Sequence, residues 1–302
     1  FVRREEDRAE FNRVSIRSIA SQIHFAINRH PMWFDHRAAL QSPWLGLRSS
    51  GENRPLFRNF KLTGSPQIPR MISLARGDEL RGWQSRFFAE TTPQFTTGMV
   101  PVNVIQGVGT EVAQIASDWK LFDSIINAAK QEVVGGKSRQ SLLQYHRPLL
   151  DGERIAYEFF HQAKELEVHP AIGRLAFLFE PGGIRIHWIT DGELEWTGLP
   201  EDNVTLEPLN RRGPRPFPLK ENDWNAVSVS HSGGKIEITL NDVLVYSRKM
   251  ENGVGGKFGL YRNCDRGVQV RHVSMTGEWP KAIPQEFLDN PTTLNDSKMM
   301  SP

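Results

Sequence analysis

The stretch GRLAFLFEPGGIRIHWIT, residues 173–190, decides how this chain is expected to fold. Two alternating runs lie on either side of a Pro-Gly-Gly turn. Because successive side chains of a β-strand point to opposite faces, Leu175, Phe177 and Phe179 form one apolar face of the first run. Two such runs around a glycine turn predict an antiparallel β-hairpin.

The same alternation continues toward the C-terminus, with turns rich in glycine, asparagine and aspartate between the runs. Short strands at this regular spacing are typical of a sandwich or a barrel. Closing them into two packed antiparallel sheets also protects the edge strands. We therefore expect a mainly β fold, with strands at residues 142–150, 154–160, 174–180, 184–190, 224–232, 235–241, 242–249, 257–262 and 268–277.

The N-terminal segment is expected to be a helical arm. Between residues 5 and 29 the apolar residues Phe11, Val14, Ile19 and Ile23 recur at roughly helical spacing. Pro31 would end this helix, because proline lacks the amide donor and clashes with the preceding turn.

This expectation divides the chain into three parts. They are a helical arm with its connecting segment at 1–53, a β-sandwich at 54–284 and a polar tail at 285–302.

The composition limits the possible partners. The 302 residues carry 37 Lys and Arg against 35 Asp and Glu, a net charge of +2. Such a balance argues against nucleic-acid binding, which needs a basic stripe. No run reaches the roughly 18 apolar residues of a membrane span. Cys264 is the single cysteine, so no internal disulfide can form.

Four motifs near the C-terminus carry a family resemblance. They are the segments Trp224–Val229, Ile236–Asp242, Gly256–Tyr261 and Val268–Val273. Their order resembles the closing half of concanavalin-like jelly-roll sandwiches, the group of lectins and glucanases. The resemblance implies a concanavalin-like jelly roll of two antiparallel sheets.

A narrower resemblance covers residues 56–284. YHRPLLDGERIAYEFF, NRRGPRPFPLKENDWN and GEWPKAIP are similar to an uncharacterised domain family of large planctomycete proteins. That family is distantly similar to 3-keto-disaccharide hydrolase domains. The resemblance supplies a fold and no catalytic residues, so catalysis stays open.

Residues 110–136 fit two structures. Val112, Ile115, Trp119 and Phe122 follow a helical period, but two short strands around Asp123-Ser124 fit equally well. Members of the broader sandwich group tend to open with such a hairpin, which favours the strands. Ser124 stands where that hairpin motif has glycine.

Parity also predicts a ligand face. In jelly rolls the concave sheet commonly holds the ligand, and three consecutive strands could place Glu158, Arg174, Arg185 and His187 on one outer face. Asp191 and Trp196 would lie at its rim. An exposed tryptophan beside charged groups suits sugars, because the ring stacks on the pyranose while the charges bind hydroxyls. The alternative is a cross-strand ladder of ion pairs with no ligand.

Metal binding and catalysis are further options. Asp191, Glu193 and Asn203 offer oxygen ligands for calcium. Zinc would need the fold to gather His146, His161, His169 and His187, which lack close ligand spacing. Hydrolysis of a glycosidic bond would pair Glu158 with Asp191 or Glu180, although no E-x-D-x-x-E motif is present.

The sequence thus supports two functions. The first is a carbohydrate-recognising or carbohydrate-processing module of a larger protein, with a glycan as partner and an export location (periplasm or cell surface) favoured over others. The second is a non-catalytic assembly module that contacts protein subunits through its N-terminal arm.

Overall fold

A computed structural model describes much of the chain in two compact units, residues 1–46 and residues 47–302. The described residues are 11–19, 22–36, 44, 57–64, 69–77, 79–88, 119–128, 140–162, 168–190, 198–200, 202–250, 256–263 and 267–279. The predicted polar tail and Cys264 lie outside them. No helix in these ranges is long and apolar enough to cross a membrane.

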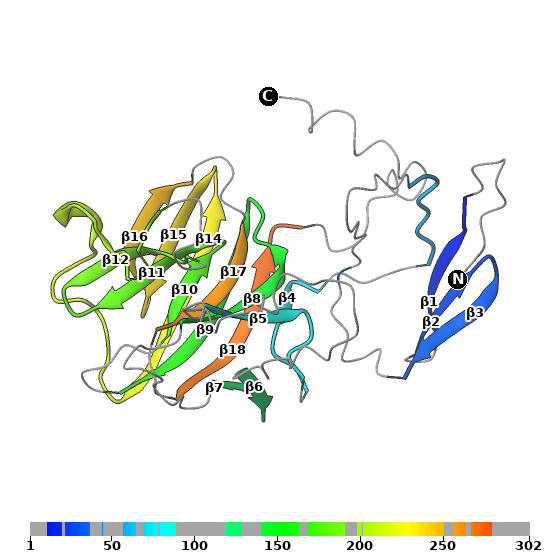
Figure 1. The fold of residues 1–302 in the computed structure, drawn as a ribbon, viewed down its shortest axis with the longest axis horizontal. Helices are drawn as coiled ribbons and strands as arrows, with labels where there is room; N and C mark the ends of the chain where they lie inside the picture. Colours follow the sequence, from blue (N-terminus) through cyan, green and yellow to red (C-terminus); the bar gives the residue numbers. More distant parts are fainter. Residues whose placement is uncertain are drawn as a thin grey trace, which may run out of the picture. The chain divides into compact units, whose positions relative to one another are not determined.

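The first unit contains a three-stranded antiparallel sheet, drawn in blue in Figure 1. Its strands are β1 (Val14–Ile19), β2 (Gln22–Ile27) and β3 (His30–Asp35), in that spatial order.

The predicted N-terminal helical arm is wrong. Asn28 and Arg29 both adopt positive φ angles, 51° and 71°, which is the conformation of a tight two-residue hairpin turn. This turn joins β2 to β3, where Phe25 pairs with Trp33, and Phe25 also pairs with Ile16 of β1, so these three apolar residues share one face of the sheet. Apolar residues three or four positions apart can also belong to two successive strands, because the alternation of side chains starts again after the turn between them. Pro31 lies within β3, where no helix needs to end.

The second unit is mainly β, and each of the nine strands expected from the sequence is present, with ends shifted by a few residues. Among the described residues its helical structure is limited to η3 (Leu209–Arg211). Its strands are β4 (Met71–Ser73), β5 (Trp83–Phe88), β6 (Trp119–Phe122), β7 (Ile125–Ala128), β8 (Gln140–Pro148), β9 (Glu153–His161), β10 (His169–Ile172), β11 (Leu175–Glu180), β12 (Gly183–Trp188), β13 (Thr205–Leu206), β14 (Asp223–Ser232), β15 (Lys235–Leu240), β16 (Val243–Lys249), β17 (Lys257–Arg262) and β18 (Val268–Gly277).

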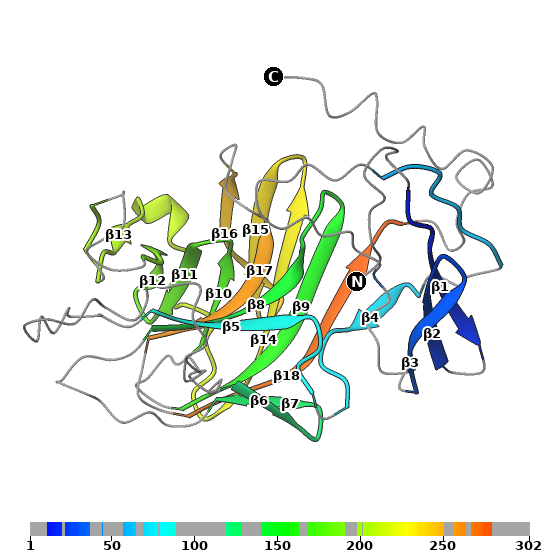
Figure 2. The same ribbon diagram turned by 45° about the vertical axis from the view of Figure 1, so that its right-hand side comes forward.

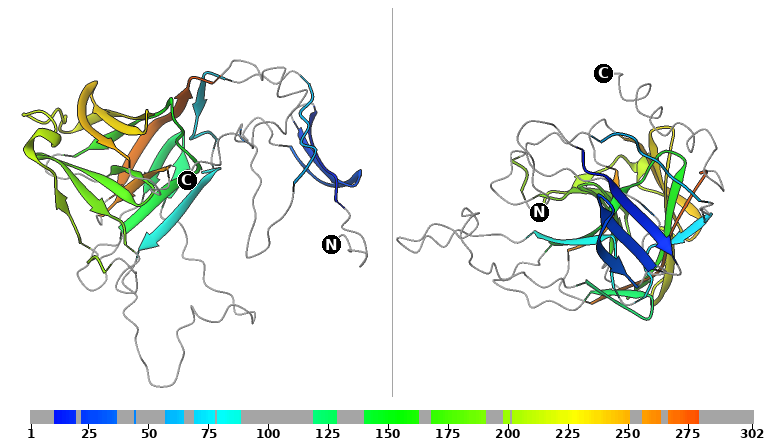
Figure 3. Two further views of the ribbon diagram at one scale, coloured as in Figure 1. Left: turned by 90° about the horizontal axis from the view of Figure 1, so that it is seen from above. Right: turned by 90° about the vertical axis from the view of Figure 1, so that its right-hand side faces the viewer.

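These strands form two antiparallel sheets within the described part of this unit, shown from further sides in Figures 2 and 3. The seven-stranded sheet has the order β13-β12-β11-β10-β17-β8-β5. The eight-stranded sheet has the order β16-β15-β14-β9-β18-β7-β6, and β4 pairs with β18 outside this path.

Aromatic contacts between the sheets form the core. Phe159 of β9 lies 6.1 Å from Phe179 of β11, measured between ring centroids, and Phe177 lies 5.3 Å from Tyr246 of β16. All four side chains are buried. Burial of large apolar surface on both inner faces is the main force that holds such a sandwich together.

Two turns show why the sequence folds as it does locally. Gly183 has a φ of 106°, and a Cβ there would lie 2.2 Å from the Arg212 carbonyl oxygen. Only glycine fits at this point of the β11–β12 turn. The hairpin of β6 and β7 is confirmed, with Asp123 and Ser124 both at positive φ, 49° and 61°. Serine thus occupies a position that usually takes glycine or asparagine.

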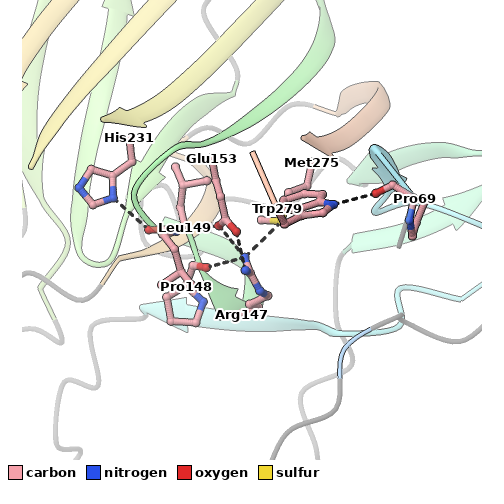
Figure 4. Close-up of polar contacts among 9 residues, drawn as sticks. Pro69, Arg147, Pro148, Leu149, Glu153, His231, Met275 and Trp279 are labelled. Atoms are coloured by element: carbon pink, nitrogen blue, oxygen red, sulfur yellow. Dashed lines mark hydrogen bonds and ion pairs between the residues drawn. The ribbon is translucent and has the colours of Figure 1, made fainter. Parts of the chain in front are cut away.

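An ion pair joins the two sheets where β8 passes into β9 (Figure 4). Arg147 of the seven-stranded sheet donates to Glu153 of the eight-stranded sheet, through Nη2–Oε1 at 2.5 Å and Nη1–Oε2 at 2.7 Å. The Leu150 amide donates to the same carboxylate at 2.8 Å. This geometry fixes the crossing between the sheets.

Candidate functional site

The predicted ligand face is divided between the two sheets. Glu158 lies on β9 of the eight-stranded sheet, whereas Arg185 and His187 lie on β12 of the seven-stranded sheet. Each points away from the common core, so they lie on opposite outer faces of the sandwich. The assumption that consecutive strands share a sheet is wrong here, because β9 pairs with β14 and β18 instead of β11.

The two arginines of the prediction have local roles in the structure. Arg174 lies in the turn between β10 and β11, where its carbonyl accepts the Ile189 amide at 2.8 Å. Arg185 pairs with Glu180 of the neighbouring strand, with Nη1–Oε1 at 3.2 Å. Cross-strand pairs with this much exposure contribute little to stability.

His187 is buried, with 2% of its surface exposed. Its Nδ1 lies 2.5 Å from the Asn203 carbonyl oxygen, its Nε2 lies 3.3 Å from Gln140 Oε1, and its ring is 5.2 Å from that of Tyr261. Burial lowers the pKa of His187, and the Asn203 carbonyl and the charge of Asp202 offset this only in part. A neutral imidazole has one N–H, which donates to the Asn203 carbonyl, and the ring packs beside Tyr261 on this face.

The predicted rim and calcium ligands are described only in part. Asp191, Glu193 and Trp196 lie outside the described residues. The side-chain amide of Asn203 holds the loop onto β12, because Oδ1 accepts the Trp188 amide at 3.0 Å and Nδ2 donates to the Trp188 carbonyl at 2.8 Å. Calcium binding therefore stays a prediction.

Zinc binding was expected only if folding gathered four histidines. His146 is exposed on β8, while His161, His169 and His187 are buried on β9, β10 and β12. Within the described residues, no three His, Cys, Asp or Glu side chains gather in a way that could hold a metal ion.

A groove of about 330 Å³ lies on the eight-stranded sheet, at the end of strands β7, β9 and β18. It is lined by Asn127, Ala128, Phe160, Gln162, Gly267, Val268 and Gln269. Gln269 stands opposite Asn127 in the β18–β7 ladder and donates to its Oδ1 at 3.4 Å. Two amides thus present donors and acceptors side by side.

The aromatic side of this groove continues onto the next strand. Trp224 of β14 pairs in register with Phe160 of β9, and their ring centroids lie 5.6 Å apart in an edge-to-face arrangement. The row Asn127, Gln269, Phe160 and Trp224 therefore crosses four adjacent strands on the outer face of the sheet. We call it the amide-aromatic row.

An ion pair lies beside the amide-aromatic row. Arg271 Nε donates to Glu158 Oε2 at 2.7 Å, His272 Nδ1 lies 3.4 Å from the other oxygen, and the guanidinium carbon is 3.9 Å from the centre of the Trp224 ring. Partial burial raises the pKa of Glu158, but the hydrogen bonds from Arg271 and His272 outweigh it and lower the pKa. The carboxylate therefore stays ionised at neutral pH.

Of the predicted site residues that the structure describes, only Glu158 adjoins this groove. Parity within β9 predicts its outward orientation. Gln269 and Asn127 are 142 residues apart, however, and nothing local pairs them.

Two family models match separate stretches of the chain. Residues 134–282 match a domain of unknown function, DUF1583_N, and residues 15–119 match a protein family of unknown function, DUF1581. Among curated proteins, none matches this sequence.

Several solved structures are similar to this chain at low identity. A candidate glycosyl hydrolase from Parabacteroides distasonis is 13% identical with a TM-score of 0.38, covering 68% of this chain and 93% of that one. The carbohydrate binding module CBM66 from Bacillus subtilis is 12% identical with a TM-score of 0.36, covering 53% and 91%. The exoplasmic/lumenal domain of VIP36 is 10% identical with a TM-score of 0.35, covering 72% and 91%.

Proposed function

We propose that the second unit is a carbohydrate-recognising module that binds a glycan in the groove beside the amide-aromatic row. The observation that carries this proposal is the juxtaposition of Asn127 and Gln269 with Phe160 and Trp224 on four neighbouring strands. Amides donate to and accept from hydroxyl groups at once, and an aromatic surface packs on the apolar face of a sugar ring.

The ion pair of Glu158 and Arg271 would set the orientation of the ligand. An ionised carboxylate accepts strong hydrogen bonds from sugar hydroxyls, and the guanidinium is fixed by its stacking on Trp224. These side chains belong to strands rather than loops, so little ordering entropy is lost on binding.

Binding, rather than hydrolysis, is the proposed activity. Glycoside hydrolysis ordinarily uses two carboxylates about 5–9 Å apart. Among the described residues of the groove and its adjoining ion pair, Glu158 supplies the only carboxylate.

The test is a glycan array followed by calorimetry on the glycans that bind. Gln269→Ala should weaken binding about fivefold, since one hydrogen bond contributes about 1 kcal/mol, and Asn127→Ala should act alike. Gln84→Ala is the matched control, because Gln84 is an exposed strand glutamine on the other sheet. Equal affinity in the Gln269 and Gln84 variants, or a blank array, would reject this groove as a glycan site.

Assembly through the first unit is a second candidate function. Val14, Ile16 and Trp33 are exposed on one face of the three-stranded sheet, where the register groups them with Phe25 and Ile27. A second copy of the chain could cover this face. Light scattering should then show a dimer that Ile16→Asp dissociates, while a monomer at all concentrations would exclude this function.

A further inference from the structure

The three-stranded sheet of the first unit has a basic face that the proposed function does not use. Register places Arg17 of β1 opposite His24 of β2, and His24 opposite Phe34 of β3. Directly opposed residues share a face, so these three side chains lie together. Arg13 precedes β1 at the same parity and joins them.

A hollow of about 410 Å³ opens on this basic face. Its lining includes Arg13, Arg17, Arg29, His24, Phe34 and Trp33. This volume is in the range of sites that hold small ligands.

Among the described residues, none around the hollow neutralises its charge. Its lining contains three arginines and no aspartate or glutamate. Asp35, the acidic residue described in this sheet, is paired in register with Ile23 and so belongs to the opposite face. Within the described part of the chain, Arg13, Arg17 and Arg29 form no ion pair.

Three exposed arginines with no carboxylate partner among the described residues repel one another, and an anion would relieve that repulsion. The planar guanidinium matches carboxylate and sulfate groups with two parallel hydrogen bonds. The hollow also exposes Phe34, which an isolated anion would not need but which can pack against a sugar ring.

We propose that this basic hollow binds an acidic glycan, whose carboxylate or sulfate groups pair with Arg13, Arg17 and Arg29 while a sugar ring packs on Phe34. The site belongs to the first unit and shares no residue with the groove of the second. Either site can therefore fail without the other.

The experiment measures binding of the full chain to immobilised polygalacturonate, heparin and dextran. Polygalacturonate carries carboxylates, heparin carries sulfates as well, and dextran is neutral. Binding is expected to one or both acidic polymers and to weaken about tenfold between 50 and 300 mM salt, since exposed charges are screened. Dextran should not bind through this site.

Substitutions in the basic hollow test whether the acidic polymer binds there. Arg17→Glu should weaken binding to the acidic polymer at least tenfold. Arg154→Glu makes the same charge change on an exposed strand residue of the second unit and should stay within about twofold of the original chain. The double variant Arg17→Gln and Arg29→Gln removes two positive charges but keeps polar side chains, and it tests the site again if Arg17→Glu disturbs the small sheet.

Two results would overturn the proposal. The first is unchanged binding in both the Arg17→Glu chain and the double glutamine variant, which would place the anion elsewhere. The second is equally tight binding of poly-glutamate, which would mean that charge alone is recognised and that the ligand is not defined by its sugar. If glycan-array binding is lost only in the Gln269→Ala chain, that result concerns the groove of the second unit. Failure of that groove and failure of the basic hollow can therefore be told apart.

Discussion

Removal of the Glu153 carboxylate tests how the two sheets are joined. In Glu153→Ala, the guanidinium of Arg147 loses both of its bonds to the carboxylate, and the Leu150 amide loses its acceptor. The side chains are 15% exposed at Arg147 and 7% exposed at Glu153, so water replaces these bonds poorly.

The expected cost follows from this burial. Removing one partner of a buried pair leaves an uncompensated charge and usually costs about 3–5 kcal/mol. Because Arg147 reaches water in part, we expect the lower end, about 3 kcal/mol. With a urea m-value of about 3 kcal/mol/M, the unfolding midpoint should fall by about 1 M.

Urea unfolding followed by tryptophan fluorescence measures this change. Glu237→Ala is the control, because Glu237 and Lys235 form an exposed pair with Nζ–Oε1 at 2.9 Å. That substitution should cost at most about 1 kcal/mol. If the two glutamate variants unfold at the same urea concentration, the pair of Arg147 and Glu153 does not join the sheets and the reasoning is refuted.

Three further predictions concern a turn, a buried histidine and a hairpin. Gly183→Ala should lower stability by more than about 2 kcal/mol because its Cβ would meet the Arg212 carbonyl, while Gly182→Ala, with open space around it, should change little; equal melting temperatures would contradict this. Burial, aided by the charge of His187, lowers the pKa of His169 to about 3, so the unfolded chain binds more protons below its unfolded value of 6.5. Stability is then full above pH 6.5 and falls as the pH drops toward 3, by at most about 1.4 kcal/mol per pH unit, and an unchanged slope in His169→Asn would reject this cause. Ser124→Gly should raise the melting temperature, since glycine adopts its φ of 61° without strain; a lower value would count against that turn geometry.

The surroundings of Gly183 and His187 depend on residues that are far away in the sequence. The close approach at Gly183 could be suspected from a Pro-Gly-Gly turn, but its partner Arg212 is 29 positions further along the chain and only the fold identifies it. His187, expected on a solvent-facing ligand surface, is buried beside His169 and Tyr261 instead.

The sequence alone predicted nine strands of the second unit, and alternation predicted which side chains of these strands enter the core. Alternation is a local property, so Phe177 and Phe179 could be assigned to the interior without knowledge of any neighbouring strand. The same rule placed Glu158 outward, as the structure has it.

Only the tertiary structure decided which strands are neighbours. Pairing depends on contacts between residues far apart in the chain, and parity within one strand carries no information about its partner. Glu158 and His187 therefore separated onto two sheets, while Asn127 and Gln269 came together across 142 residues. In the first unit, apolar spacing predicted a helix, whereas the structure has a sheet in which Asn28 and Arg29 form the turn between β2 and β3.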